Sequence, residues 1–322
     1  MVHRLNQERI VLLIAVLMFV LFSATLNGFL SPDNLLSLVQ NVSILGILGV
    51  GMAMAIIVRG IDLSMVATMT LSVAWMLDMI NNGTPIPVAL LFAIGFVVLV
   101  GLVNGLLIAY VEIPAIFATL AMGILVYGFG KSWLVNTDVV YLPAGDSWFY
   151  KIGSGRVLGV PTPVLIFAAV SLLAYAFLRY LKPGRFIYGM GDNPLAARIT
   201  GIPVRPMIVV QYVLIALIAL VAGIVTATAV ASMNTRVALS TLVYDVILVV
   251  VLGGIGLSGG KGGIRNVVVG TLLIGILLNG MTIMNLTYTM QNILKSVILL
   301  AAIVIDTLLN PRDEQTAQHG DI

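Results

Sequence analysis

Long apolar runs, separated by short polar turns, divide the chain into ten segments. The turns carry strong turn chemistry, such as Ser31-Pro32-Asp33 and Asn81-Asn82-Gly83-Thr84-Pro85. Most runs approach the roughly 20 apolar residues that a helix needs to cross a bilayer. We expect spanning helices near residues 10–27, 35–58, 62–80, 86–109, 114–135, 163–180, 207–231, 240–257, 264–284 and 289–308. The pattern therefore predicts an all-α polytopic membrane protein with one transmembrane domain over residues 1–322.

Composition supports this class. Of the 322 residues, 60% are hydrophobic and only 9% are charged, whereas soluble domains carry roughly 25% charged residues. The chain has no cysteine, which excludes disulfides, thiolate metal sites and cysteine nucleophiles. His3 and His319 both lie in the polar ends, so we expect no metal site within the membrane. The first apolar run is long and lacks a small-residue cleavage site, so we expect it to be retained as a span.

The distribution of lysine and arginine predicts the orientation. Eleven of these residues fall on one side of the predicted spans and five on the other. Because positively charged loops stay in the cytoplasm, both termini are expected there, as the tails 1–9 and 309–322. The loop at 181–206 falls on the same side. The longest loop on the outer side, 136–162, is rich in aromatic residues, which suit an interfacial belt or a short amphipathic segment.

The chain also contains a candidate internal repeat. Asn104-Gly105 recurs as Asn279-Gly280, 175 positions later. The segment Arg59 to Ser64 has a weaker counterpart at Arg236 to Ser240. This offset maps spans two to five onto spans seven to ten and reverses their orientation, which predicts a five-helix inverted repeat. Coincidence between glycine-rich apolar runs is the alternative.

The loop at 181–206 is the clearest candidate for docking a soluble partner. Asp192 or Asn193 can cap a short helix with Pro194 in its first turn, and Gly201 can end it. Arg198 offers a forked donor to partner carboxylates. The alternative is an ordinary positively charged loop that serves only topology. The candidate docking residues are Gly191, Asp192, Asn193, Ala196, Ala197, Arg198 and Gly201.

Several polar residues fall inside predicted spans, where they are costly unless bonded or wetted. They are Asp62, Ser64, Asn104, Thr119 and Asn279. One interpretation is that they line a translocation path. The other is structural: Asp62 and Ser64 cap the third span, Thr119 bonds to a neighbouring helix, and the two asparagines bond between helices at crossings that small residues permit.

Asp245 and Lys295 lie at equal depth in the eighth and tenth predicted spans. Equal depth permits an ion pair that would fix these helices together. The alternative is that Lys295 extends alone toward the outer surface.

Two short patterns resemble nucleotide sites but fail in detail. Gly254-Ile-Gly256-Leu-Ser-Gly259 matches a dinucleotide fingerprint, yet no acidic residue follows at the required spacing. Gly130-Lys131-Ser132 lacks the first glycine of a phosphate loop, because position 125 is leucine. We therefore expect no cofactor on this chain, and a nucleotide site only on a partner.

Taken together, several motifs resemble one family, the permease subunits of bacterial ABC importers for ribose, other monosaccharides and autoinducer-2. The motifs are Gly60-Ile-Asp62-Leu-Ser64, Gly101-Leu-Val-Asn104-Gly105, Ile113-Pro114 to Leu120, Gly184-Arg185, Gly191-Asp192-Asn193, Ala196-Ala197-Arg198, Gly253 to Gly263, Leu278-Asn279-Gly280, Gln291 and Asp306. Arg59 stands where the family often has glycine, Met65 and Val66 replace a usual Val-Gly, and Ala115 replaces a common proline.

The resemblance implies a non-enzymatic subunit that forms the translocation path for a sugar or sugar-like solute. It also implies a second permease chain, cytoplasmic ATPase subunits that bind ATP and magnesium, a periplasmic solute-binding protein, and residence in the bacterial inner membrane. Residues 181–206 would then be the ATPase-coupling loop. The alternatives are an ion-gradient-driven secondary transporter and a non-transporting structural subunit, and within the ABC class an amino-acid substrate remains open.

Overall fold

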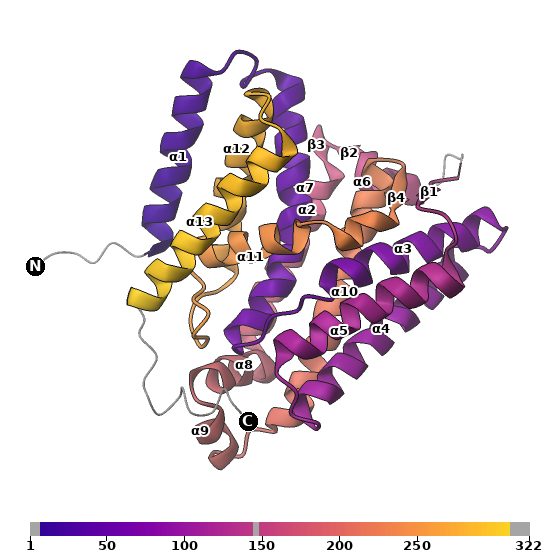
Figure 1. Cartoon of the computed structure of the whole chain (residues 1–322), viewed down its shortest axis with the longest axis vertical. Helices are drawn as coiled ribbons and strands as arrows, with labels where there is room; N and C mark the ends of the chain where they lie inside the picture. Colours follow the sequence, from indigo (N-terminus) through magenta and orange to yellow (C-terminus); the bar gives the residue numbers. More distant parts are fainter. Residues whose placement is uncertain (1–6, 144–147, 310–322) are drawn as a thin grey trace, which may run out of the picture.

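The computed structural model describes residues 7–143 and 148–309 of the chain, and these form an almost entirely helical bundle (Figure 1). Each of the ten predicted spans contains an apolar helix. The helices are α1 (Gln7–Thr25), α2 (Pro32–Ile57), α3 (Met65–Asn81), α4 (Ile86–Ala109), α5 (Ala115–Phe129), α7 (Thr162–Tyr180), α10 (Val204–Ala229), α11 (Leu242–Leu252), α12 (Ile264–Ile283) and α13 (Tyr288–Leu309). Among the described residues, seven helices are long and apolar enough to cross a membrane.

The eighth predicted span is too long, and the third begins slightly later than predicted. The prediction placed 62–80 and 240–257 in helices, but α3 begins at Met65 and α11 covers only 11 residues. Before α3, residues 60–64 form a non-helical segment whose backbone is bonded by side chains. Before α11, the chain forms strand β4 (Ser232–Asn234) and the short helix η3 (Thr235–Leu239). The predicted tails fall mostly outside the described residues, although Gln7 to Arg9 already belong to α1.

Helix α2 lies at the centre of the bundle. Its second half, from position 44 on, is apolar on all sides, and a helix of this kind is stable only when surrounded. Positions 45–57 of α2 are buried throughout. The outer helices α1, α4 and α5 instead expose large apolar side chains, which suit contact with lipid.

Two close helix crossings repeat in the two halves of the chain. Gly101 and Gly105 let α4 approach α10, because an added Cβ at these positions would stand 2.7 Å from Val213 Cα and 2.5 Å from Val209 Cα. In the same way, Gly275 lets α12 approach α2 at Val42, where a Cβ has no room. Since α4 corresponds to α12 and α10 to α2 under the predicted offset, the paired crossings support the internal repeat.

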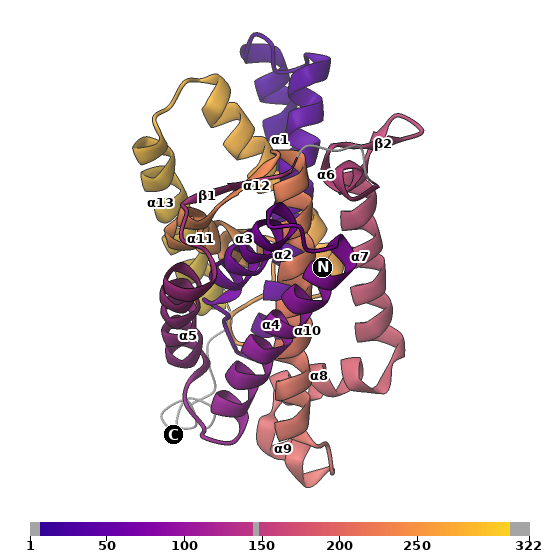
Figure 2. The same ribbon diagram turned by 90° about the vertical axis from the view of Figure 1, so that its right-hand side faces the viewer.

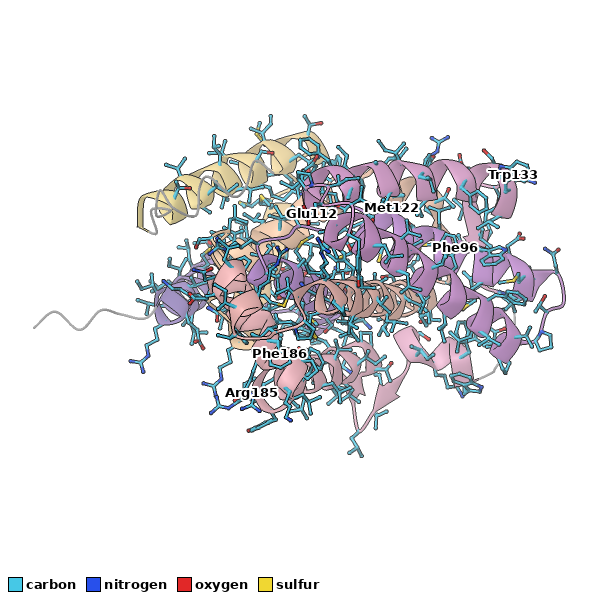
Figure 3. All side chains as sticks on the ribbon, turned by 90° about the horizontal axis from the view of Figure 1, so that it is seen from below. Phe96, Glu112, Met122, Trp133, Arg185 and Phe186 are labelled. Carbon is cyan, nitrogen blue, oxygen red and sulfur yellow. The ribbon has the colours of Figure 1, made fainter. Side chains whose placement is uncertain are left out.

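The two ends of the bundle carry different structures (Figures 1 and 2). One end carries η1 (Gly130–Leu134), β1 (Val139–Tyr141), η2 (Trp148–Tyr150), α6 (Lys151–Ser154), β2 (Arg156–Val157) and β3 (Val160–Pro161). There β1 pairs antiparallel with β4, and β2 with β3. The opposite end carries two short helices, α8 (Lys182–Asp192) and α9 (Pro194–Ile199). Trp133 and Arg185 mark these two regions in the view from below (Figure 3).

Candidate functional site

The predicted docking loop folds into two helices instead of one. The sequence analysis predicted the short helix α9 but not α8, whose apolar face buries Ile187 and Met190 against the bundle. Asn193, not Asp192, caps α9. Its side-chain oxygen accepts hydrogen bonds from the amides of Leu195 and Ala196, each with a length of 3.0 Å. These bonds satisfy amides that the first turn of a helix leaves free.

The candidate docking residues divide into an inward and an outward group. Gly191 and Ala197 are buried against the bundle, so they face this chain and not solvent. Asp192, Asn193, Ala196, Arg198 and Gly201 are exposed. The outward side of α9 also presents Ile199, which is 87% exposed. An exposed apolar side chain beside an arginine gives α9 a surface suited to a protein partner.

Three segments meet where α8 ends. The Nε of Arg59 donates a hydrogen bond to the carbonyl of Gly191 at 2.8 Å. A terminal nitrogen of its guanidinium donates to the carbonyl of Asp192 at 2.7 Å. The amide of Gly260 donates to the carbonyl of Ile57 over 2.8 Å. A Cβ on Gly191 would collide with the carbonyl oxygen of Ile57. The end of α8 is therefore fitted tightly against the end of α2 and the loop before α12.

From the sequence, Arg59 is a departure from the family pattern and the start of a candidate repeated segment, and these contacts to α8 were not predicted. The residue has φ +64°, a left-handed conformation that glycine adopts without strain and arginine does not. Because the family that the sequence resembles often has glycine at this position, the arginine could have indicated that its side chain has a specific role. Here the strained backbone is retained together with a guanidinium that bonds α8.

Four of the five candidate path residues gather around the segment after Arg59. The Asp62 carboxylate accepts hydrogen bonds from the amide of Ser64 at 2.9 Å and from its hydroxyl at 2.6 Å. Asn104 of α4 donates to the Ser64 hydroxyl over 2.9 Å. Thr119 of α5 accepts from the Leu63 amide over 3.1 Å. All four side chains are buried, so this polar cluster connects residues 61–64 to α4 and α5 and is closed to solvent.

The fifth candidate, Asn279, has a different environment. Its amide group exchanges two hydrogen bonds with that of Asn34, over 3.0 and 2.8 Å. The pair joins α12 to the start of α2, which corresponds to the structural interpretation of Asn279. The structure does not bring Asn279 into the Asp62 cluster.

Asp245 and Lys295 lie together between α11 and α13. The Lys295 Nζ is 2.7 Å from one carboxylate oxygen of Asp245 and 2.8 Å from the other. The side chains are 13% and 8% exposed, so the charges are mostly removed from solvent. This is the arrangement expected of an ion pair that fixes two helices.

A cavity of about 280 Å³ adjoins this pair. Its polar lining includes Thr241, Tyr244, Asn292 and Ser296, none of which the sequence analysis singled out. The signal was present, because Asn292, Lys295 and Ser296 share one face of a helix through their spacing. The cavity thus offers carboxylate, ammonium, amide and hydroxyl groups side by side.

The end of the bundle away from α8 and α9 carries a cluster of charged residues. Asp138 forms ion pairs with Lys131 at 3.0 Å and with Arg236 at 2.7 Å, beside the β1–β4 pair. Hydrogen bonds from Lys131 and Arg236 lower the pKa of the Asp138 carboxyl.

Phe149 of the predicted aromatic segment is buried, whereas Trp148 is exposed. Among residues 7–143 and 148–309, no group of acidic or histidine side chains could hold a metal ion.

Comparison with known proteins gives the family. Residues 34–305 match the family described as the branched-chain amino acid transport system / permease component. The ribose import permease protein of Escherichia coli strain K12 is 34% identical over 299 residues, which cover 91% of this chain and 92% of that protein. The galactofuranose transporter permease protein of the same strain is 34% identical over 281 residues, covering 87% of this chain and 80% of that protein.

A third relative is named for a different sugar, fructose. The fructose import permease protein of Rhizobium meliloti is 30% identical over 306 residues, covering 92% of this chain and 84% of that protein. No solved structure matches the chain. The family model covers most of the chain, and the three relatives match over 80% or more of their length. The chain therefore belongs to the ABC-importer permeases of the branched-chain amino acid transport system / permease component family.

Proposed function

We propose that this chain forms the translocation path of an ABC importer for a sugar or sugar-like solute. The observation that carries the proposal is the junction at the end of α8. Arg59 joins this end to the buried polar segment of the membrane domain, and the exposed, capped helix α9 follows directly. The names of the relatives, which refer to ribose, galactofuranose and fructose, support a sugar as the solute.

The importer requires partners that supply energy and substrate. Cytoplasmic ATPase subunits bind ATP and magnesium and hold α9 through Arg198 and Ile199. A second permease chain, identical or related, completes the path. A periplasmic binding protein delivers the solute to the opposite end, which includes residues 136–162. This arrangement puts the chain in the bacterial inner membrane with both termini in the cytoplasm.

Coupling runs from α9 to the membrane domain. Movement of the ATPase subunits shifts α9 and the end of α8. Because Arg59 holds the carbonyls of Gly191 and Asp192, the shift pulls on residues 60–64. These residues carry the Asp62 cluster, which is bonded to α4 and α5. The hydrogen bonds therefore give a continuous route from the docking helix to two spanning helices.

The solute path includes the cavity between α11 and α13. Sugar hydroxyls both donate and accept hydrogen bonds, and the lining groups Asp245, Asn292 and Lys295 offer both kinds of partner. An unpaired charge in the path would demand a charged solute, whereas the ion pair leaves the lining neutral overall. The cavity thus suits a neutral polyhydroxyl compound.

An ion-gradient-driven transporter is the second candidate, because a buried carboxylate such as Asp62 can serve as an ion-coupling group. The two functions differ in their requirement for ATP hydrolysis. Purification of the tagged chain from its native membrane, followed by mass spectrometry of the associated proteins, tests this point. The ABC function predicts a stoichiometric ATPase subunit.

The matched variants are Arg198→Ala, at the docking surface, and Arg156→Ala, an exposed arginine of β2 at the opposite end. We expect the first to lose the ATPase and the second to retain it. Uptake of labelled ribose, galactose and leucine into proteoliposomes containing the assembled importer then identifies the solute class. Absence of an ATPase both after purification and after crosslinking in the membrane would contradict the ABC function.

A further inference from the structure

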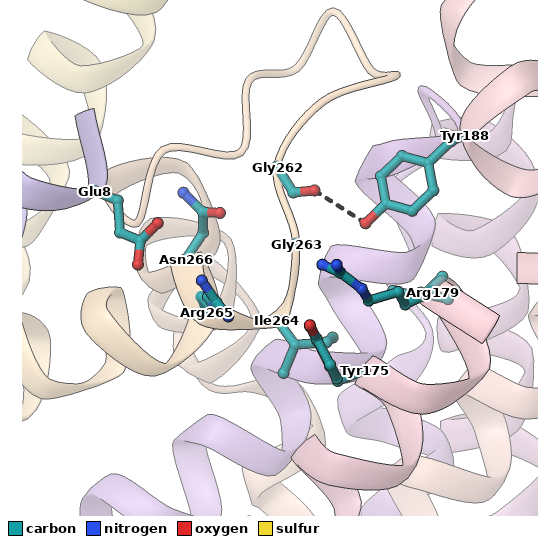
Figure 4. A pocket seen from close by; sticks show the side chains of 10 residues that line it. Glu8, Tyr175, Arg179, Tyr188, Gly262, Gly263, Ile264, Arg265 and Asn266 are labelled. Atoms are coloured by element: carbon teal, nitrogen blue, oxygen red, sulfur yellow. Dashed lines mark hydrogen bonds between the residues drawn. The ribbon is translucent and has the colours of Figure 1, made fainter. Parts of the chain in front are cut away.

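A second cavity, with a volume of about 340 Å³, opens near the α8–α9 end of the bundle. It lies between α1, α7, α8 and α12 (Figure 4). Its lining combines Arg179 of α7, Arg265 of α12 and Tyr175 between them with the backbone of Gly262 and Gly263. This cavity is separate from the one beside Asp245 and shares no lining residue with it.

The two arginines converge on one aromatic ring. The guanidinium carbon of Arg179 lies 5.7 Å from the centre of the Tyr175 ring, and that of Arg265 lies 5.9 Å from it. Each contact is a cation–π interaction, which helps to hold a guanidinium group in place. Two like charges around one ring repel each other, so the arrangement gains stability when an anion lies between them.

The described part of the chain does not neutralise this pair. The ion pairs among residues 7–143 and 148–309 use Lys131, Arg205, Arg236 and Lys295 as their cations. Glu8 lies at the margin of the cavity and lines it, which leaves two positive groups against one negative group. The cavity therefore keeps a net positive charge.

Two further polar side chains of the cavity wall have structural roles. The amide of Asn266 donates to the carbonyl of Gly253 at 2.8 Å. The hydroxyl of Tyr188 donates to the carbonyl of Gly262 over 3.0 Å and fixes the loop before α12 (Figure 4). This bond holds the start of α12, and with it Arg265, beside α7. The two guanidinium groups thus remain available to a ligand with several acceptor oxygens, such as a phosphate.

Exposed apolar side chains surround the cavity. Leu172 and Leu173 precede Tyr175 on α7 and are 66% and 70% exposed, and Leu13 and Leu17 of α1 are exposed in the same way. Acyl chains can pack on such surfaces while a head group occupies the cavity. Basic pockets between helices near a membrane surface are typical binding sites for anionic lipid head groups.

We propose that the cavity formed by Arg179, Arg265 and Tyr175 binds a phosphate group, and that its source is the head group of an anionic phospholipid in the leaflet next to α8 and α9. The site lies against the loop of Gly262 and Gly263 and against α8. A bound head group would therefore hold α7, α8 and α12 together beside the docking helix.

The test uses the full chain, purified with its associated subunits in mild detergent. Native mass spectrometry measures retention of phosphatidylglycerol against phosphatidylcholine with the same acyl chains. A thermal-shift titration with inorganic phosphate at constant ionic strength measures binding of the free anion. Both are repeated with Arg179→Gln/Arg265→Gln, with Arg179→Lys/Arg265→Lys, and with Arg156→Gln as the matched control at the opposite end.

We expect the wild-type protein to retain phosphatidylglycerol selectively, the double glutamine variant to do so about 25-fold more weakly (about fivefold for each of the two arginines), and the Arg156→Gln control to behave as the wild type. The lysine variant keeps both charges and should retain most of the selectivity, which separates loss of charge from loss of folding. Stabilisation by phosphate without lipid selectivity would support the site but assign it to the free anion. Equal retention of both lipids by the wild-type protein together with no phosphate response, or selectivity that survives in the glutamine variant, would overturn the proposal.

Discussion

The Nε of Arg59 lies 2.8 Å from the carbonyl oxygen of Gly191, which joins the end of α2 to the end of α8. A helix leaves its last carbonyls without intrahelical partners, and the guanidinium supplies one. The bond crosses 132 residues of sequence and connects the surface helices to the segment that carries Asp62. It is a direct contact between the membrane domain and the end of α8, which α9 follows in the chain.

Replacing Arg59 should uncouple transport from ATP hydrolysis more than it destabilises the protein. Arg59→Gly removes two charge-assisted hydrogen bonds but also relieves left-handed backbone strain of roughly 1–2 kcal/mol, which offsets part of the loss in stability. Water can also bond the freed Asp192 carbonyl, because this contact is exposed. We expect a moderate fall in melting temperature and a decrease of about tenfold in solute imported per ATP hydrolysed. Both quantities are measured in proteoliposomes with the complete importer.

Arg59→Lys separates the two contributions. Lysine keeps the strain and one charge but cannot donate to both carbonyls with a planar fork. It should lower the import ratio as well and should be less stable than Arg59→Gly. An import ratio equal to that of the wild-type protein in both variants would show that the Arg59 contacts do not transmit movement.

Gly191→Ala tests how tightly α8 is fitted against α2. A Cβ at this position collides with the Ile57 carbonyl, so the variant must displace the backbone of either helix. We expect a loss of at least about 2 kcal/mol of stability, in the range typical of an overpacked buried site. Thermal unfolding monitored by loss of monodisperse protein after heating provides the measurement.

Gly189→Ala is the matched control on the same helix. A Cβ there meets only the end of the Ile202 side chain, at 3.4 Å. Because alanine favours a helix over glycine by about 1 kcal/mol, this variant should be as stable as the wild-type protein or slightly more stable. Equal behaviour of the two alanine variants would contradict the tight junction.

Local features of the fold were accessible from the sequence. Turn residues and apolar runs predicted an apolar helix in each of the ten spans. Asp192 or Asn193 before Pro194 indicated the cap of α9, and the structure assigns it to Asn193. Equal depth in two spans led to Asp245 and Lys295, which the structure brings together. Each of these features depends on neighbouring residues or on position along a spanning helix, and periodicity and turn chemistry report on both.

Contacts between distant segments were not accessible in the same way. Helix α8 was not predicted because its glycines at 184, 189 and 191 disfavour a helix. The helix is stabilised instead by its packing on the bundle. The Asn34–Asn279 pair spans 245 residues. The short extent of α3 and α11 follows from segments that leave the helical conformation because tertiary partners bond them, and such partners leave no periodic pattern.

The Asp245–Lys295 pair should matter for folding when it is broken singly. Asp245→Asn leaves a mostly buried ammonium without its counter-charge, and removing one partner of a buried pair typically costs about 3–5 kcal/mol. Because some solvent reaches both side chains, we expect the lower end of this range. Lys295→Met should be less damaging, since Asp245 can be neutralised by protonation.

The double exchange Asp245→Lys/Lys295→Asp is the control for this pair. It restores opposite charges between α11 and α13, so folded yield should recover relative to the single variants. Yield is measured as monodisperse protein recovered from the membrane. Single variants that fold and transport like the wild-type protein would show that the pair has no structural role.

The Asp138 contacts predict a dependence of stability on acid pH. Since hydrogen bonds from Lys131 and Arg236 lower the pKa of Asp138 below its usual value of 3.8, the folded state favours the charged carboxylate. A depressed pKa stabilises the folded protein above the usual value, and this contribution is lost as the pH falls through the lower, folded-state pKa. We therefore expect the melting temperature of the wild-type protein to fall more steeply below about pH 4 than that of Asp138→Asn, which cannot titrate. Arg236→Gln, which removes one donor, should lie between them. Parallel melting curves for the wild-type protein and Asp138→Asn from pH 3 to pH 7 would show that the contacts between Asp138, Lys131 and Arg236 do not stabilise the β1–β4 end of the bundle.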